Sequence, residues 1–271
     1  MNHLLVIKAG GAAGLDLDAC ARDIAAISAE QPVVLIHGVS AALDALCAER
    51  GAPVRTLTSP SGHVSRYTDA ATRDLYVEAA GRVGQSWVDA LARHGAQAQV
   101  ASPAVTAERK DALRAVIDGR VRIVRDDYTG SITGAETGAI ATLLNSGLLP
   151  VVPPVAVSPD GLLNVDGDRT AAALAAALGA HTLLILSNVR GLYRDPADPD
   201  SLVVHIHPQA MPQALDWAAG RMKRKVIAAQ DALAGGVARV VIGDGRRASP
   251  VRDGLAGIGT VFSAVNNGVE A

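Results

Sequence analysis

The sequence is poor in aromatic residues and in cysteine. Only 3% of its 271 residues are aromatic, with a single phenylalanine, so aliphatic side chains and alanine must fill the core. The two cysteines, Cys20 and Cys47, are too few for a disulfide framework or a cysteine-based metal site, and they fit a reducing compartment. These scarcities exclude the small disulfide-rich and zinc-ribbon classes and predict a cytoplasmic protein.

Long apolar runs and strong net charge are also missing. Lys8 interrupts the N-terminal apolar run, and Gly179 and His181 divide the apolar stretch 170–186, so neither a secretory leader nor a membrane span is expected. A net charge of −2 argues against a general nucleic-acid or membrane-surface role. The chain contains no GxxxxGK[ST], and no GxGxxG follows its first strand, so the two common phosphate-binding motifs are absent.

What the sequence does contain is a regular alternation of strand-like and helix-like segments. Helical spacing predicts helices such as 17–28, with Asp16 as its N-cap, and 69–93, ended by Gly95. Short apolar runs rich in Val, Ile and Leu predict buried strands at 4–7, 33–36, 183–186 and 237–242. This alternation predicts an α/β fold, a three-layer αβα sandwich with a largely parallel central sheet.

Other segments are expected to be less regular. Residues 55–66 predict a loop or irregular hairpin, and Asp118-Gly119 is a strong hairpin-turn signal. A helix is expected at 134–145, and a helical stretch at 211–234 should break near Gly220. Without a linker or repeat, the chain reads as one domain, 1–271. Two lobes, about 1–155 and about 156–271, would meet at a seam near 153–164.

Five stretches place glycine or polar residues where ligands bind in open α/β sheets. Lys8–Gly11 and His37–Gly38 follow early strands and therefore lie at the carboxyl edge of the sheet. Asn164–Asp168 precedes a helix, Ser187–Pro196 follows a strand, and Gly220–Lys225 opens a helix with four cations in five residues. Taken singly, each has a plain structural explanation: a helix cap, a glycine turn, a core histidine or a solvated basic face.

In this order, the five stretches resemble the amino acid kinase family, enzymes of acetylglutamate-kinase type that phosphorylate a carboxylate with ATP. The resemblance runs from Lys8 to Val261. Within the family, the chain is similar to kinases acting on aminoadipate or glutamate attached to an amino-group carrier protein in lysine or arginine biosynthesis. The motifs that carry this similarity are VSRYTD (64–69), DDYTG (126–130), DGD (166–168), SNV (187–189) and RMKRK (221–225).

The resemblance implies a separate role for each residue of the site. A carboxylate acceptor is ionised at neutral pH, so its phosphorylation needs positioning and charge neutralisation rather than a general base. Lys8 and Lys225 would flank the transferring phosphoryl group, with Asp168 holding both lysines in place. Backbone N–H groups of three glycines would bind its oxygens: Gly10, Gly11 and Gly38.

The resemblance also implies ligands and partners. Arg66 and Asn164 would bind the acceptor, Mg²⁺ would bridge the phosphates of ATP, and a homodimer is expected, with no protein-bound metal. Arg221 and Arg224 are expected to dock a small acidic carrier protein. The nucleotide would be bound by Ser187, Asn188, Gly191, Leu192, Tyr193, Asp195, Met222 and Lys223.

Four departures from the family pattern fall in the acceptor-binding half. Ala12 replaces the serine of KxGGS, Val39 replaces the second glycine of HGG, and Gly84-Gln85 replaces the Asn-Lys pair of GLVNK. The glycine-rich LSGxDG loop is shortened to 101–104. Two alternatives therefore stay open beside a working carrier-dependent kinase. One is an ATP-binding homologue that has lost catalysis and regulates or scaffolds a partner. The other is a kinase of free N-acetylglutamate.

Overall fold

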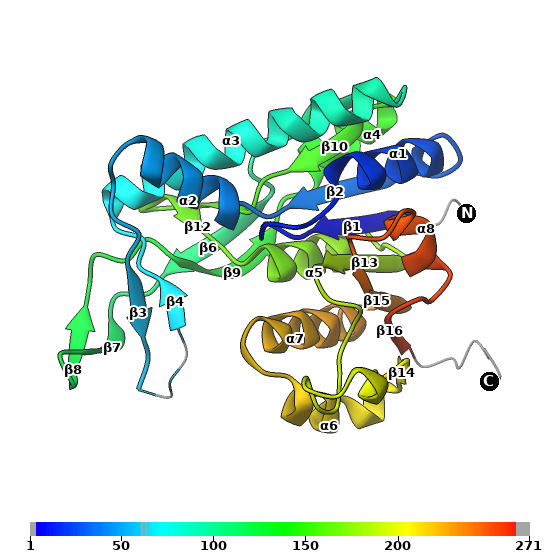
Figure 1. Cartoon of the computed structure of the whole chain (residues 1–271). Helices are drawn as coiled ribbons and strands as arrows, with labels where there is room; N and C mark the ends of the chain where they lie inside the picture. Colours follow the sequence, from blue (N-terminus) through cyan, green and yellow to red (C-terminus); the bar gives the residue numbers. More distant parts are fainter. Residues whose placement is uncertain (1–3, 61, 63, 264–271) are drawn as a thin grey trace.

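The chain folds around one eight-stranded sheet, shown in Figure 1. The structure, a computed structural model, describes residues 4–60, 62 and 64–263. The strand order is β14-β16-β15-β13-β1-β2-β10-β5, and every neighbouring pair is parallel except β15–β16. The strands are β1 (Leu5–Ala9), β2 (Val33–His37), β5 (Ala98–Val100), β10 (Leu149–Val152), β13 (Thr182–Ser187), β14 (His205–Ile206), β15 (Arg239–Asp244) and β16 (Thr260–Ser263).

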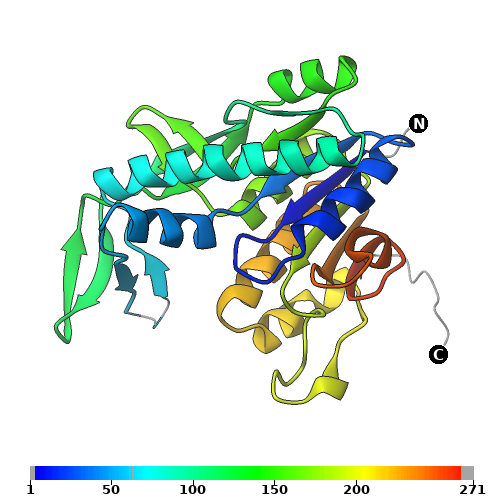
Figure 2. The same ribbon diagram turned by 45° about the horizontal axis from the view of Figure 1, so that its top comes forward.

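Helices cover both faces of this sheet, which confirms the predicted three-layer αβα architecture (Figures 1 and 2). Successive residues of a strand point to opposite faces, so Leu5 and Ile7 of β1 enter one core while Val6 enters the other. The first layer is α1 (Leu17–Ser28), α3 (Ala70–Arg93) and α8 (Pro250–Leu255), with α2 (Ser40–Glu49) against α3. The second layer is α4 (Gly138–Asn145), α5 (Gly167–Ala177), α6 (Met211–Trp217) and α7 (Gly220–Ala234).

Aspartate side chains begin three of these helices. Asp16 accepts a hydrogen bond from Ala19 N at 2.9 Å, as predicted for α1. Asp69 caps α3 in the same way. At α5 the cap is Asp166, so Asp168 lies inside the first turn and is free for another role.

Two four-stranded sheets extend the fold on the side of α2 and α3. The first has the order β12-β11-β6-β9, with β6 (Val105–Arg109), β9 (Gly130–Ala135), β11 (Val155–Ser158) and β12 (Gly161–Asn164). The second, which we call the arm, has the order β4-β3-β7-β8, with β3 (Thr56–Thr58), β4 (Val64–Arg66), β7 (Leu113–Ile117) and β8 (Arg120–Val124). The arm projects from one end of the molecule, at the lower left of Figure 1. The hairpin at Asp118-Gly119 is confirmed, because both residues have positive φ, 51° and 71°.

The structure corrects one predicted helix. The helix expected at 134–145 begins only at Gly138, because 130–135 forms β9 and pairs with β6, a strand that was not predicted. No cluster of three or more metal-ligating side chains occurs in the described residues. None of the helices described there is both long and apolar enough to span a membrane.

Candidate functional site

Three charged side chains from separate elements meet at the carboxyl edge of the central sheet. Lys8 lies on β1, Asp168 in the first turn of α5, and Lys225 on α7. One oxygen of Asp168 lies 2.7 Å from the Lys8 ammonium, and the other lies 2.9 Å from that of Lys225. All three residues are buried, with exposed fractions of 6%, 5% and 8%. One anion facing two cations leaves a positive charge in a nearly dry site, which favours an anionic ligand.

The charge states of this trio follow from its burial. Burial by itself raises the pKa of Asp168, but the charges of Lys8 and Lys225 outweigh that effect and hold it well below its ordinary value. Burial and the charge of Lys8 lower the pKa of Lys225, while Asp168 opposes them. Asp168 is therefore a permanent anion that positions the lysines rather than a group that exchanges protons.

Local backbone structure places the trio. Asp166 accepts hydrogen bonds from the backbone N–H groups of Asp168 and Arg169, at 2.9 and 3.0 Å, and so fixes the first turn of α5. A Cβ atom at Gly167 would lie only 3.3 Å from Cε of Lys8. The glycine therefore gives the lysine side chain room to pass the helix start and reach Asp168.

The two glycine turns contact each other through their backbones. A Cβ on Gly11 would lie 2.4 Å from the carbonyl carbon of Gly38, closer than any real side chain approaches. The N–H of Gly10 donates to Leu186 O, and the N–H of Gly38 donates to Ala9 O. This corrects the predicted role of Gly10 and Gly38, whose N–H groups already have acceptors within the protein. Glycine at these two positions instead allows the turns to pack closely.

The replacement at Val39 is accommodated without strain. Its φ of −126° is ordinary for a β-branched residue, and its side chain is buried beside Leu43 and Tyr76. The hydroxyl of Ser40, which was not singled out from the sequence, and the N–H of Ala41 both donate to Gly11 O. The start of α2 is thus attached to the Lys8–Gly11 turn.

His37 is a buried imidazole that lacks a full set of partners. Its Nδ1 lies 3.4 Å from Gly38 O, and its Nε2 is buried with no hydrogen-bond partner in the described part of the chain. Burial, together with a smaller effect of the nearby Lys8 charge, lowers its pKa to about 4, so the ring is neutral at pH 7. Close packing accounts for the glycine at position 84. A Cβ on Gly84 would lie 3.1 Å from the Val100 side chain and 3.4 Å from Nε2 of His37.

The two predicted acceptor-binding residues lie around Thr68. Arg66, at the end of β4, forms an ion pair with Asp44 of α2, and its Nη1 is buried without a partner among the residues described. Asn164, at the end of β12, donates from its amide to the hydroxyl of Thr68 at 3.1 Å. Asp127 in turn accepts from the Thr68 N–H at 3.0 Å and fixes this corner.

The predicted nucleotide segment after β13 is a structured loop. Gly191 is required where the loop meets β16, since a Cβ would lie 2.5 Å from the hydroxyl of Thr260. That hydroxyl accepts from the N–H of Leu192, which is 1% exposed, so Leu192 anchors the loop in the core. Asp195 accepts from Ala197 N and shapes the following turn. Ser187 is buried, Tyr193 and Met222 are half-buried, and Asn188 and Lys223 are exposed.

A further fixed cation beside this loop was missed from the sequence. Asp244, at the carboxyl end of β15, binds the guanidinium of Arg246 through two hydrogen bonds of 2.8 and 2.7 Å. Gly245 N donates to Ser187 O at 2.7 Å, which joins this turn to the nucleotide segment. The available signal was an Asp-x-Arg sequence directly after a buried strand.

The two arginines expected to dock a partner are placed differently. Arg221 is exposed at the start of α7. Arg224 is half-buried, and its guanidinium lies 3.6 Å from Asp166 and 3.5 Å from the backbone oxygen of Val64. Arg224 therefore borders the arm.

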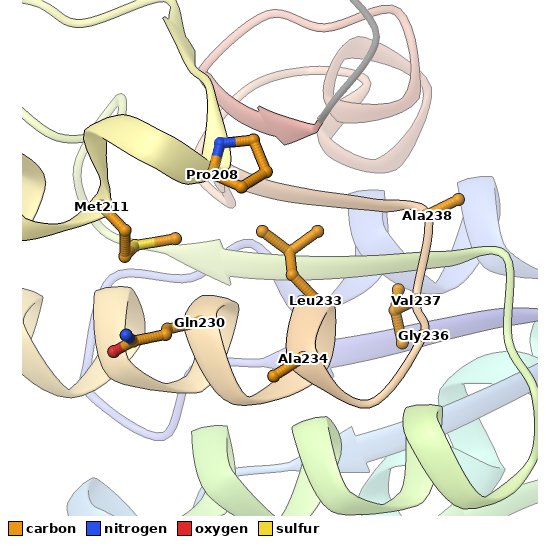
Figure 3. A pocket seen from close by; sticks show the side chains of 8 residues that line it. All are labelled: Pro208, Met211, Gln230, Leu233, Ala234, Gly236, Val237 and Ala238. Atoms are coloured by element: carbon orange, nitrogen blue, oxygen red, sulfur yellow. The ribbon is translucent and has the colours of Figure 1, made fainter.

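A hollow lies away from this site. It has a volume of about 390 Å³ and is lined mainly by apolar residues, with Pro208 and Met211 on one side and Leu233 of α7 on the other (Figure 3). It opens between the far end of α7 and the amino end of β15, where Val237 and Ala238 lie. Lys225 lies near the opposite end of α7, so the hollow is separate from the charged trio.

Comparison with known proteins agrees with this geometry. Residues 3–244 match the sequence profile of the Amino acid kinase family. The chain is 42% identical to a [LysW]-aminoadipate kinase of Deinococcus radiodurans, over 96% of this chain and 92% of that one. It is 40% identical to a [LysW]-aminoadipate kinase of Thermus thermophilus, over 95% and 99%.

Solved structures show the same fold. An N-acetylglutamate synthase from Neisseria gonorrhoeae, complexed with coenzyme A and N-acetyl-glutamate, matches with a TM-score of 0.77 and 28% identity. The match covers 96% of this chain and 59% of that longer protein. A carbamate kinase from Giardia lamblia bound to AMP-PNP matches with a TM-score of 0.71 and 19% identity, over 97% and 98% of the two chains. The profile match and the identities to the two curated kinases show that the chain belongs to the amino acid kinase family.

Proposed function

We propose that this chain is an ATP-dependent kinase of a carrier-bound amino acid. It phosphorylates the side-chain carboxylate of 2-aminoadipate, or glutamate, attached to an amino-group carrier protein, and the product is an acyl phosphate. The observation that carries the proposal is the buried trio, in which Asp168 holds Lys8 and Lys225 2.7 and 2.9 Å from its two oxygens. The names of the two [LysW]-aminoadipate kinases support the choice of acceptor and carrier.

The trio suits transfer to a carboxylate. The acceptor oxygen is already an anion at neutral pH, so it attacks the terminal phosphorus of ATP without a general base. A new carboxyl O–P bond forms while the bond to the bridging oxygen of ADP breaks. Lys8 and Lys225 bind the phosphoryl oxygens from two sides and neutralise their charge, and Gly11 completes the turn beneath them. Asp168 keeps the two ammonium groups from separating.

ATP and Mg²⁺ fit the donors that are present. Both oxygens of Asp168 are held by lysines, and Asp244 is held by Arg246, so neither carboxylate is open to a metal ion. Mg²⁺ would therefore be held by the ATP phosphates and water, and it would draw charge from the γ-phosphate. The segment 187–195, with Met222 and Lys223, binds the nucleotide.

The acceptor enters from the other half of the chain. The unused Nη1 of Arg66 and the amide of Asn164 bind the substrate's carboxylate and amide. Arg221 and Arg224 contribute to docking an acidic carrier protein. In this scheme, about 1–155 forms the acceptor lobe and about 156–271 the nucleotide lobe. We further propose a cytoplasmic homodimer, by analogy with the family, which light scattering on the purified protein would test.

Turnover with defined acceptors tests the proposal. The purified chain is supplied with ATP, Mg²⁺ and carrier-bound aminoadipate, carrier-bound glutamate or free N-acetylglutamate, and acyl phosphate is trapped as the hydroxamate. Hydroxamate should form with a carrier-bound acceptor and require Lys225. Nucleotide binding without turnover on any acceptor would instead support the regulatory alternative. Turnover on free N-acetylglutamate alone would reassign the substrate.

A further inference from the structure

The solvent face of the arm is unusual because it is apolar. Residues opposite each other in an antiparallel pair share a face, so Val116 lies with Val121, and Arg114 lies with Ile123. Thr58 pairs with Val116 and also with Val64, which extends the same face across all four strands. We call this the arm face, and its residues are Thr56, Thr58, Val64, Arg66, Arg114, Val116, Val121 and Ile123.

Four aliphatic side chains on the arm face are open to solvent. Their exposed fractions are 54% for Val64, 39% for Val116, 49% for Val121 and 60% for Ile123. The other face of the arm includes Ala115, which is 1% exposed. An exposed sheet face normally carries polar side chains, so adjacent apolar residues on the solvent side indicate a contact surface.

The strands that carry these aliphatic residues are also rich in positive charge. Between positions 110 and 125 the chain has five cationic residues against two acidic ones, whereas the whole protein carries −2. Arg114 lies on the arm face, whereas Arg120 and Arg122 lie on the opposite face of β8. All three are exposed, and no ion pair joins them to a carboxylate within the described ranges. Unneutralised charge of one sign, with Arg114 directly beside Ile123 on the apolar face, fits a partner surface of the opposite sign.

The arm face leads directly to the acceptor residues. Arg66 is paired with Thr56 on the same face, two cross-strand pairs along from Thr58 and Val64. Arg224 of α7, next to Lys225, reaches the backbone oxygen of Val64 from the other side. A molecule lying on the arm face would therefore border both Arg66 and the start of α7.

We propose that the arm face is the docking surface for the carrier protein, an inference that rests on the proposed function. The complementary surface is a small apolar patch surrounded by carboxylates. A second copy of this chain fits poorly, because a symmetric contact through this face would bring the cations of one arm against those of the other. A carrier docked here delivers its attached amino acid toward Arg66.

Paired variants test the docking surface. Val121→Ser with Ile123→Ser removes two exposed side chains, and Val204→Ser is the matched control, since Val204 is 56% exposed and lies beside β14 at the far edge of the central sheet. Affinity for carrier-bound aminoadipate is measured by calorimetry, together with KM for ATP and hydroxamate formation. The double variant should bind the carrier at least about tenfold more weakly, with KM for ATP unchanged. The control should match the wild type.

Each other outcome has a distinct meaning. Unchanged carrier affinity in the double variant, with normal turnover, overturns the docking surface and leaves the proposed function standing. Absence of carrier binding and turnover in the wild type overturns the proposed function itself. A change in oligomeric state of the double variant, seen by light scattering, assigns the arm face to a second copy and overturns the carrier assignment. Unaltered far-ultraviolet dichroism and melting temperature show that the variants fold.

Discussion

Replacing Asp168 by asparagine should damage both stability and turnover, for one electrostatic reason. The substitution keeps the shape of the side chain but leaves two ammonium groups facing each other, at residues only 6% and 8% exposed. Removing one partner from a buried ion pair typically costs about 3–5 kcal/mol, and the near absence of solvent here argues against a smaller value. For a domain of this size, that loss lowers the melting temperature by on the order of 10 °C.

Turnover should fall further than stability explains. Without the carboxylate, Lys8 and Lys225 no longer hold their separation, and we expect kcat to fall by roughly 10²–10³-fold. Urea unfolding followed by dichroism gives the free energy of unfolding, and hydroxamate formation gives kcat. The control is Asp168→Asn combined with Lys225→Met, which returns the site to its original net charge. It should regain part of the stability and none of the activity.

The reasoning is refuted by a specific result. If Asp168→Asn unfolds within about 1 kcal/mol of the wild type, the two ammonium groups are better solvated than their burial indicates. If it also keeps kcat within tenfold, Asp168 does not position the lysines. If the double variant is no more stable than the single one, repulsion between the lysines is not the source of the loss.

Three further substitutions have defined outcomes. The His37 pKa of about 4 lies below its ordinary 6.5, so the stability that the neutral ring contributes is fully present above pH 6.5. The free energy of unfolding should fall by about 3 kcal/mol as the pH falls toward 4. His37→Gln should flatten urea-unfolding stability over that range, and a profile parallel to the wild type would contradict this. Gly11→Ala places a Cβ 2.4 Å from the Gly38 backbone. It should lower kcat at least about 100-fold and the free energy of unfolding by about 1–3 kcal/mol. Turnover and unfolding near wild-type values would refute the contact. Val39→Gly should destabilise by about 2 kcal/mol in thermal unfolding without raising kcat, whereas a gain in kcat would show that valine impairs the turn.

The main chain of the central fold was predictable because its signals are local. Buried strands such as 183–186 and capped helices such as 17–28 carry their pattern within a dozen residues. β6 and β9 were missed because each is stabilised by the other, through pairing across more than 20 residues and a bulge between Thr106 and Ala107. A long-range pair with irregular register leaves little trace in either sequence segment.

The candidate site was predictable in its residue types and less so in its contacts. The order of motifs marked Lys8, Asp168 and Lys225, and the structure brings them together. The order of motifs could not show that the N–H groups of Gly10 and Gly38 donate to acceptors within the protein, since these acceptors lie on other strands or turns. The arm face was equally hidden, because which residues share a face follows from strand register.

The register of the arm sets how far a tethered substrate must reach. Three steps between neighbouring strands separate β8 from β4, roughly 14 Å at about 4.8 Å a step, and the register offsets Ile123 from Arg66 by four residues along the strands, roughly another 13 Å. An extended chain covers the resulting span of about 19 Å in about six residues. A carrier bound over Ile123 therefore needs only a short, flexible attachment to place its carboxylate at Arg66. A tether of matching length gives the highest effective concentration, so the enzyme would select substrates partly by the length of the carrier segment to which the amino acid is attached.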